Sequence, residues 1–165
     1  MKTFSPAPFI LFAALFLALP LAVMADEATR LKSLDAFWAE VSRTVREGDF
    51  DGYKATCHGE GVLVSGVKKM SQPLARALER WKQEFADTKA GKMKASVDFR
   101  FSQRLGDDTT ALETGIFLYS SVSADGQVRN EYIHFEELLV KRDGWKGLME
   151  YQKSKATVEE WDALK

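Results

Sequence analysis

Cysteine is nearly absent from the sequence, and its scarcity excludes several kinds of protein. Cys57 is the single cysteine among 165 residues. No intrachain disulfide can form, so disulfides do not stabilise the fold, and one sulfur cannot build a thiolate metal cluster. The pair Cys57-His58 looks like a nucleophile with its base, but adjacent side chains seldom point at each other. We interpret Cys57 as a small buried apolar residue.

A surplus of charge of one sign is also lacking. The chain has 23 basic and 24 acidic residues, a net charge of −1, so electrostatics favour neither nucleic acid nor anionic lipid as a partner. Glycine-rich phosphate loops, zinc-ligand spacings and Gly-x-Ser-x-Gly elbows do not occur, which disfavours nucleotide-dependent, zinc-dependent and serine-hydrolase chemistry. His134-x-Glu136 offers only two ligands on one strand. We therefore predict no cofactor and no metal site.

The first 25 residues differ in composition from the rest of the chain. Lys2 is the only charged residue before Asp26, and the stretch from Phe9 to Ala25 carries no charge. A membrane-spanning helix needs about 20 apolar residues, more than this stretch has. We predict that residues 1–25 are a secretory signal cleaved after Ala25, with an uncleaved anchor as the alternative. Residues 26–165 would then be one secreted or periplasmic domain with no membrane contact.

Apolar residues at spacings of three and four predict helices in the first half of the domain. The predicted order is a long helix over residues 27–47, a short helix capped by Asp49, a strand over residues 62–64 and a third helix capped by Ser71. A short C-terminal helix should begin at Thr157, which forms a capping-box pattern with Glu160.

From residue 94 the apolar period changes to two, which predicts strands. Turn signals stand at Asp107-Asp108, Asp125-Gly126 and Asp143-Gly144, and the last two are typical of two-residue hairpin loops. They divide residues 94–154 into four long strands in meander order.

Three helices followed by a long antiparallel meander resemble the nuclear-transport-factor-2-like superfamily, which includes ketosteroid isomerase and SnoaL-like cyclase relatives. The local carriers of the resemblance are Arg46-Glu47-Gly48-Asp49-Phe50 and Asp143-Gly144-Trp145-Lys146. The resemblance covers nearly all of residues 26–165 and implies an α+β cone. In it, three N-terminal helices pack on a curved antiparallel sheet, and a short helix ends the chain. This fold hosts enzymes, binding modules and assembly domains, so it does not define an activity.

Two-residue loops would fix the register of the strands and place Glu137 opposite Glu150 on the helix-facing side. Like charges in a cross-strand pair are destabilising. Partial burial would raise the pKa of one carboxyl, which would then take up a proton or recruit a cation. A carboxyl in that state is what a general acid or base requires, so these two glutamates are the candidate catalytic residues.

A ligand pocket beside the two glutamates would combine hydrogen-bonding groups with apolar walls from the helices. The predicted ligand-binding residues are Thr114, Gln152, Trp38, Tyr53, Trp81, Phe85 and, at the mouth of the cone, His58. Three interpretations stay open: glutamates that are solvated or salt-bridged at the rim, a ligand pocket, and a catalytic site. A single β-bulge would move every later residue to the other face.

The opposite face of the sheet is expected to mix aromatic and charged side chains, and the resemblance implies a homodimer contact there. Its predicted members are Arg100, Phe117, Tyr119, Tyr132, His134, Glu136 and Tyr151, with Arg100 reaching over Gly115 to Glu136. The first functional hypothesis is an exported module that binds a small, largely apolar molecule. The alternatives are an isomerase-type or cyclase-type enzyme with a pocket glutamate as general acid or base, and a non-catalytic dimerisation or assembly domain.

Overall fold

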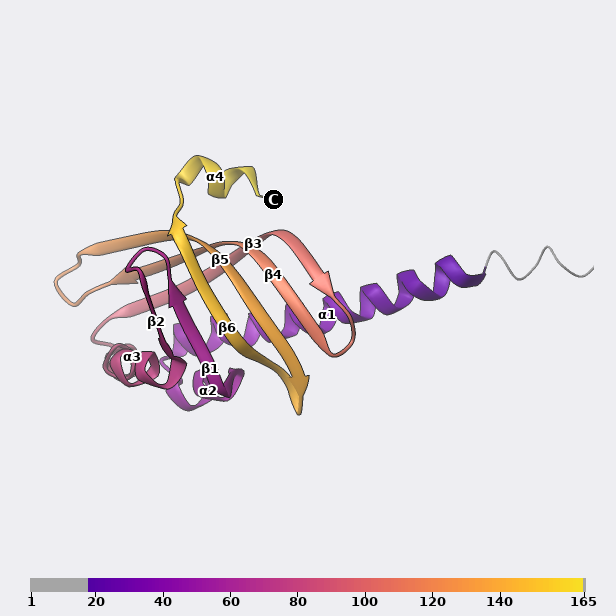
Figure 1. Ribbon diagram of the computed structural model, residues 1–165. Coiled ribbons are helices and arrows are strands. Elements are labelled where there is room, and N and C mark those ends of the chain that lie inside the picture. The colour runs from indigo at the N-terminus through magenta and orange to yellow at the C-terminus, as the bar shows by residue number, and fades with distance from the viewer. Residues whose placement is uncertain (1–17, 165) are drawn as a thin grey trace, which may run out of the picture.

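The computed structural model describes residues 18–164, in which four helices accompany one six-stranded sheet (Figure 1). The helices are α1 (Ala18–Glu47), α2 (Phe50–Thr56), α3 (Leu74–Lys89) and α4 (Val158–Ala163). The strands are β1 (Cys57–Ser65), β2 (Met70–Pro73), β3 (Lys94–Gly106), β4 (Thr110–Val122), β5 (Val128–Arg142) and β6 (Gly144–Lys155). Within the predicted signal segment, residues 1–17 lie outside the described residues and residues 18–25 belong to α1. None of the described helices is long and apolar enough to span a membrane.

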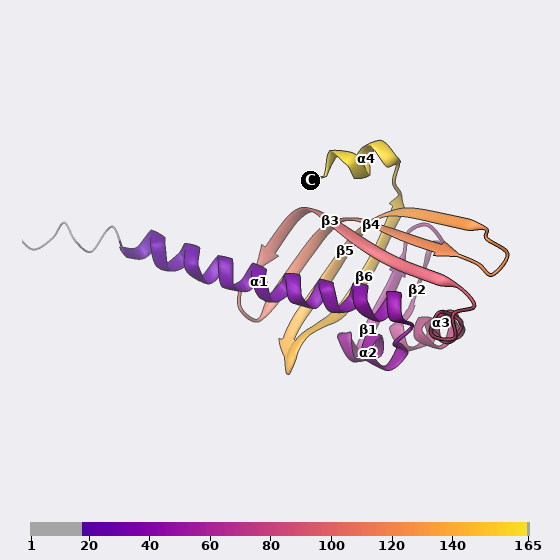
Figure 2. The same ribbon diagram turned by 180° about the vertical axis from the view of Figure 1, so that it is seen from behind.

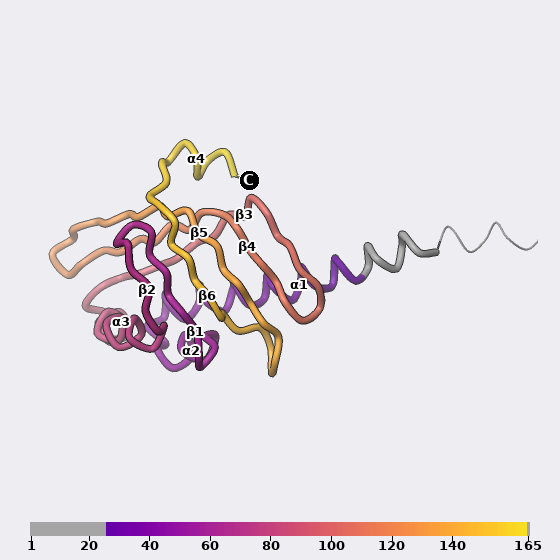
Figure 3. Tube along the Cα trace, viewed as in Figure 1, coloured from indigo at the N-terminus to yellow at the C-terminus, as the bar shows by residue number. Residues whose placement is uncertain are grey.

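The strands are ordered β2-β1-β6-β5-β4-β3, so the predicted meander of β3 to β6 forms most of the sheet. β1 runs parallel to β6, which makes the sheet mixed rather than wholly antiparallel. The long strands curve together, as the Cα trace in Figure 3 shows, and α1 crosses one face of them with α2 and α3 beside it (Figure 2). The predicted α+β architecture is confirmed, including the short C-terminal helix.

Helix α1 brings the central core residue, Trp38, to the curved sheet. The Trp38 ring lies 4.4 Å from the ring of Phe99, 5.4 Å from that of Phe101 and 5.7 Å from that of Phe135, measured between centroids. Burying an apolar side chain of this size stabilises the fold by roughly 1.5–3 kcal/mol. The predicted apolar stripe of the first helix therefore becomes the surface that fixes α1 against β3 and β5.

Caps decide where the shorter helices begin. The Asp49 side chain accepts a hydrogen bond from the Gly52 backbone N–H at 3.0 Å, and Thr157 forms the predicted capping box with Glu160. The predicted cap of the third helix is wrong, because Ser71 lies in β2 and pairs with Val64 of β1. The backbone of Ser71 belongs to a hairpin, and α3 begins after the extended residue Pro73.

Strand β4 has a different register from the predicted one, because neither of its loops has two residues. The β3–β4 loop spans residues 107–109 and the β4–β5 loop spans residues 123–127. Glu137 therefore pairs with Glu113 rather than with Thr114, while Glu137 still pairs with Glu150 as predicted. A shift of one residue exchanges the two faces of a strand. The residues of β4 that face the helices are Glu113, Gly115, Phe117 and Tyr119.

Candidate functional site

A cavity of about 290 Å³ lies between the three N-terminal helices and the sheet. Ligand pockets in proteins are concave and mostly apolar with a few polar groups, and this cavity has that character. Its aromatic lining consists of Phe37, Trp38, Tyr53, Trp81, Phe85, Phe99, Phe117, Tyr119 and Phe135. The structure thus places four predicted aromatic pocket residues at the cavity. It adds Phe117 and Tyr119, which we expected on the outer face.

Two carboxyl groups from neighbouring strands, those of Glu137 and Glu150, line the cavity and form what we call its floor. Glu137 is only 8% exposed, and its carboxyl makes no hydrogen bond or ion pair with any described residue. Glu150 is half-buried and accepts a hydrogen bond of 2.7 Å from the side-chain amide of Gln152. Neither carboxyl has a cationic partner, which excludes the interpretation of a salt-bridged pair within the described residues.

Burial and mutual repulsion change the protonation of the floor. Burial raises the pKa of Glu137 well above its ordinary value of 4.5, and the neighbouring carboxylate of Glu150 raises it further. Burial also raises the pKa of Glu150, while the hydrogen bond from Gln152 opposes that rise. The pair therefore retains a proton at pH values at which exposed glutamates have lost theirs.

Gly147 of β6 gives the Glu137 carboxyl the space that it occupies. A Cβ atom built on Gly147 would lie 2.3 Å from Oε1 of Glu137, closer than side-chain atoms approach each other. Any other residue at position 147 would displace the carboxyl. The bulge between Leu138 and Leu139 pairs Gly147 with Leu139, so the two-residue-loop register did not reveal this contact.

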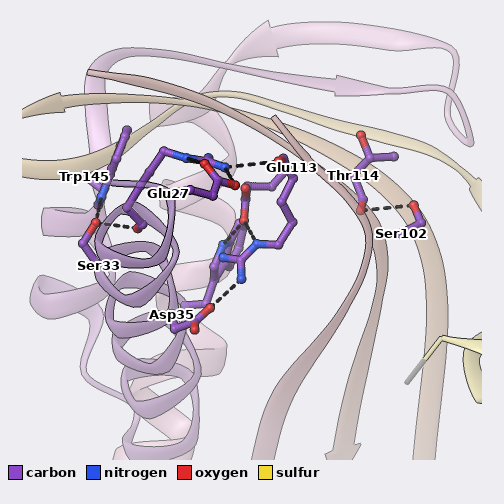
Figure 4. Close-up of polar contacts among 10 residues, drawn as sticks. Glu27, Ser33, Asp35, Ser102, Glu113, Thr114 and Trp145 are labelled. Atoms are coloured by element: carbon purple, nitrogen blue, oxygen red, sulfur yellow. Dashed lines mark hydrogen bonds and ion pairs between the residues drawn. The ribbon is translucent and has the colours of Figure 1, made fainter. Parts of the chain in front are cut away.

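A third buried carboxylate, Glu113, lies in the same cross-strand row, and we did not predict it on this face. Glu113 is fully buried, accepts a hydrogen bond of 2.6 Å from Nε of Arg104, and lies 3.3 Å from Nε1 of Trp38 (Figure 4). Arg104 also donates to Asp35 at 2.6 Å. Burial raises the pKa of Glu113, and the guanidinium of Arg104 opposes that rise. Arg104 is thus engaged by two carboxylates and leaves Glu137 uncompensated.

Tyr53 and Cys57 lie near the floor and are held in their neutral forms. Burial raises the pKa of Tyr53 well above 10, and Glu150 raises it further. Burial likewise raises the pKa of the Cys57 thiol to about 12, and its Sγ donates a weak hydrogen bond to the Tyr53 carbonyl at 3.6 Å. Because a thiolate is the nucleophile, Cys57 is unsuited to nucleophilic chemistry here. His58 does not line the cavity, contrary to our expectation, and its Nδ1 accepts from the Glu60 N–H at 3.1 Å.

The other predicted polar residue of the pocket, Thr114, lies outside the cavity. The register of β4 pairs it with Glu136 on the outer face, where its carbonyl accepts a hydrogen bond from the Ser102 hydroxyl at 3.2 Å. The placement of Thr114 in the pocket is therefore wrong. Gln152 is the predicted amide that the structure does bring to the floor.

Helix α4 packs on the outer face of the sheet. The Arg100 guanidinium stacks 4.3 Å from the Trp161 ring and donates to the Trp161 carbonyl at 2.7 Å. Tyr132 packs against the same ring, and His134 lies 3.3 Å from a carboxylate oxygen of Glu160. A part of the surface that we assigned to a homodimer contact is thus occupied by the chain's own C-terminal helix.

The other residues predicted for the outer face lie there on β5 and β6, whereas those on β4 do not. Glu136 is on this face, but it bonds to Lys153 at 2.7 Å rather than to Arg100, so the predicted Arg100–Glu136 contact is wrong. Tyr151 pairs with Glu136 and shares the face. Phe117 and Tyr119 belong to the cavity, where the Tyr119 hydroxyl donates to Glu84 at 3.3 Å. Homodimerisation through this face stays a prediction.

Comparison of the sequence with protein-family models and with curated proteins finds no match. Solved structures are similar, among them that of a conserved protein from Planctomyces limnophilus DSM 3776, 12% identical with a TM-score of 0.64, over 76% of this chain and 94% of that one. A nuclear transport factor 2-like superfamily protein from Salmonella enterica serovar Typhimurium is 14% identical with a TM-score of 0.57, over 81% and 98%. ActVI-ORFA from Streptomyces coelicolor is 17% identical with a TM-score of 0.56, over 73% and 93%. The chain therefore has the nuclear-transport-factor-2-like fold, and similarities this distant show the fold alone.

Proposed function

We propose that this domain, in an exported protein, binds a small and largely apolar molecule in the cavity and that Glu137, Glu150 and Gln152 hold the polar end of that molecule. One observation carries the proposal: a buried carboxyl without a partner among the described residues lines a mostly apolar cavity rich in aromatic side chains. Leaving a buried polar group unpaired costs on the order of 1–3 kcal/mol, and more when the group is charged. A ligand that donates a hydrogen bond to Glu137 offsets that cost.

The apolar part of the ligand has a separate support. Trp81 and Phe85 of α3, Tyr53 of α2 and Trp38 of α1 line the cavity from the helices, while Phe135 lines it from the sheet. Several of these rings already contact one another edge to face, as Tyr53 and Trp81 do at 6.1 Å. A rigid aromatic wall loses little side-chain entropy when it accepts a ligand.

A second candidate, a proton-transfer enzyme of the isomerase or cyclase type, is favoured by the same Glu137. Its raised pKa and its free oxygens suit a general acid or base next to a substrate carbonyl. Binding precedes any such chemistry, so the binding experiment below tests the requirement that both candidates share.

The proposal predicts saturable binding of N-phenyl-1-naphthylamine, an uncharged aromatic probe whose emission rises in apolar sites. We expect the Trp81→Ala variant to bind it about tenfold more weakly, because one aromatic wall is lost. Fluorescence titration measures both affinities. Tyr132→Ala removes an aromatic residue from the outer face and serves as the matched control, with an expected affinity equal to that of the wild type. Absence of saturable binding, or equal weakening by the two substitutions, contradicts the proposal.

A further inference from the structure

We propose that the polar end of the ligand is a protonated amine and that the floor pair, Glu137 and Glu150, is its counter-ion. This inference rests on the proposed function and specifies the chemical class of the ligand. It starts from the unpartnered Glu137 carboxyl in the cavity, from the second carboxyl opposite it in register, and from the absence of a protein cation beside either among the described residues.

Two cations near the floor, Arg104 in register and Lys146 in sequence, are already engaged. Arg104 is in the same cross-strand row, but its guanidinium is bonded to Glu113 and Asp35. The ammonium of Lys146, on β6, donates to the carbonyl of Ala55. The charge of the floor is therefore uncompensated from the strand side.

The other cations that line the cavity are engaged or distant. Arg80 of α3 donates a hydrogen bond of 2.9 Å to Oε1 of Gln72. Lys155 is five residues beyond Glu150 on β6, which is about 16 Å along an extended strand. Lys68 belongs to the β1–β2 hairpin loop. Lys68 and Lys155 are at the opposite end of the lining strands and Arg80 is bonded to Gln72, so a compensating cation at the floor comes from the ligand.

The surroundings of the floor also match an ammonium group. Phe135 lies two residues before Glu137 on the same face of β5, and Tyr53 is close enough for both glutamates to affect its hydroxyl. Aromatic faces attract cations when the centre of charge is within about 6 Å of the ring. An ammonium carries three N–H donors, and every unprotonated oxygen of the two carboxyls is an acceptor, so donors and acceptors are complementary. A pair that keeps one proton carries a single negative charge, which the ammonium neutralises.

An alcohol or a carboxylate of the same shape fits the floor less well. An alcohol donates one hydrogen bond and leaves the negative charge of the pair uncompensated. A carboxylate adds a second negative charge to a buried pair that already carries one, which is strongly unfavourable. The amine is the one of the three groups that neutralises the site.

Competition against bound N-phenyl-1-naphthylamine tests the inference with three probes of similar shape: 2-phenylethylamine, 2-phenylethanol and 3-phenylpropionate. At pH 7.5 we expect the amine to displace the dye at concentrations about tenfold lower than the alcohol, a difference typical of a charge-assisted hydrogen bond, and the carboxylate to be weakest. In Glu137→Gln the amine should lose this advantage while the alcohol keeps its affinity. Glu150→Gln tests the other carboxyl of the pair. It takes the place of Glu137→Gln if that variant does not fold.

The matched control is Glu136→Gln, one residue away on the same strand but on the outer face, where Glu136 is paired with Lys153. It should leave the order of the three probes unchanged. If the alcohol displaces the dye as well as the amine does, or if Glu137→Gln and Glu150→Gln keep the preference for the amine, the inference is overturned and the binding function stands. If the dye itself does not bind, the proposed function fails and the inference fails with it.

Discussion

Replacing Arg104 with methionine is expected to lower the free energy of unfolding at pH 7 by about 3–5 kcal/mol, the cost of leaving a buried charge without its partner. The Glu113 carboxylate has no exposed surface and depends on Nε of Arg104 at 2.6 Å. The Arg104 guanidinium also lies 4.4 Å from the Phe101 ring, a contact that methionine replaces only in part. Urea denaturation followed by tryptophan fluorescence measures the loss.

Two further variants distinguish the contribution of the buried Arg104–Glu113 pair to stability from that of the exposed Arg104–Asp35 pair. Combining Arg104→Met with Glu113→Leu removes both charges and should restore most of the stability, because an apolar pair replaces a buried ion pair at little cost. Asp35→Asn removes the exposed partner of Arg104. The Asp35 side chain is 62% exposed, so this substitution should change stability by less than about 1 kcal/mol. A single Arg104→Met variant as stable as the wild type would show that Glu113 does not need this cation.

Replacing Glu137 with glutamine is expected to make the protein more stable at pH 8 by on the order of 1–3 kcal/mol, because a buried unpaired carboxylate is removed. The pKa of Glu137 is raised in the folded state by burial and by Glu150, so the folded state binds the proton more tightly than the unfolded state does. The stabilisation is complete below the unfolded-state value of about 4.5 and is lost as the pH rises through the folded-state value. The free energy of unfolding of the wild type should therefore fall as the pH rises from the unfolded-state pKa to the folded-state pKa. That of Glu137→Gln should fall much less.

Denaturation at a series of pH values from 4 to 8 provides the measurement. Glu136→Gln is again the control, because Glu136 is paired with Lys153 on the outer face and its removal should give no gain at pH 8. Parallel stability profiles for the wild type and Glu137→Gln would mean that the folded protein does not hold the Glu137 proton.

The helices and most faces of the sheet could be predicted because each depends on a local repeat. The stripe of Leu34, Trp38, Val41 and Val45 is buried as its spacing indicates. Alternation placed Phe99 and Phe101 of β3 toward the helices. The pairing of Glu137 with Glu150 was predicted from a two-residue loop, and it holds because the bulge between Leu138 and Leu139 offsets the shorter turn. In α1 and β3 the period of the sequence and the period of the secondary structure agree, so no knowledge of loop length is required.

The inward face of β4 could not be predicted because it depends on loop lengths. Asp125-Gly126 marks a turn, but the hydrogen bond of 3.0 Å from the Ser123 N–H to the Gln127 carbonyl closes a loop of five residues. A bulge beside Phe101 adds a second irregularity between β3 and β4. One residue of difference placed Phe117 and Tyr119 inside the cone and Thr114 outside it. It also concealed Glu113, the partner that explains why Arg104 is unavailable to the floor.

The glutamates of this cross-strand row thus differ in how their charge is compensated. Glu113 is compensated within the chain by Arg104. The only hydrogen bond that a described residue makes to the carboxyls of Glu137 and Glu150 is the one from the Gln152 amide to Glu150. A buried carboxylate is ordinarily paired or protonated. Glu137 and Glu150, the two glutamates without a cation, line the cavity. Their position there is the reason for connecting the electrostatics of the sheet with the proposed binding of a ligand.

The most direct test of this account is a pH titration of the side-chain carboxyl carbons of Glu137 and Glu150 by carbon-13 NMR on the ligand-free protein. The account predicts that the Glu137 signal titrates well above 4.5, with the Glu150 signal responding to the same protonation step. Two independent titrations near 4.5 would contradict it, because the floor would then be solvated like an exposed surface and would have no need of a ligand to neutralise it.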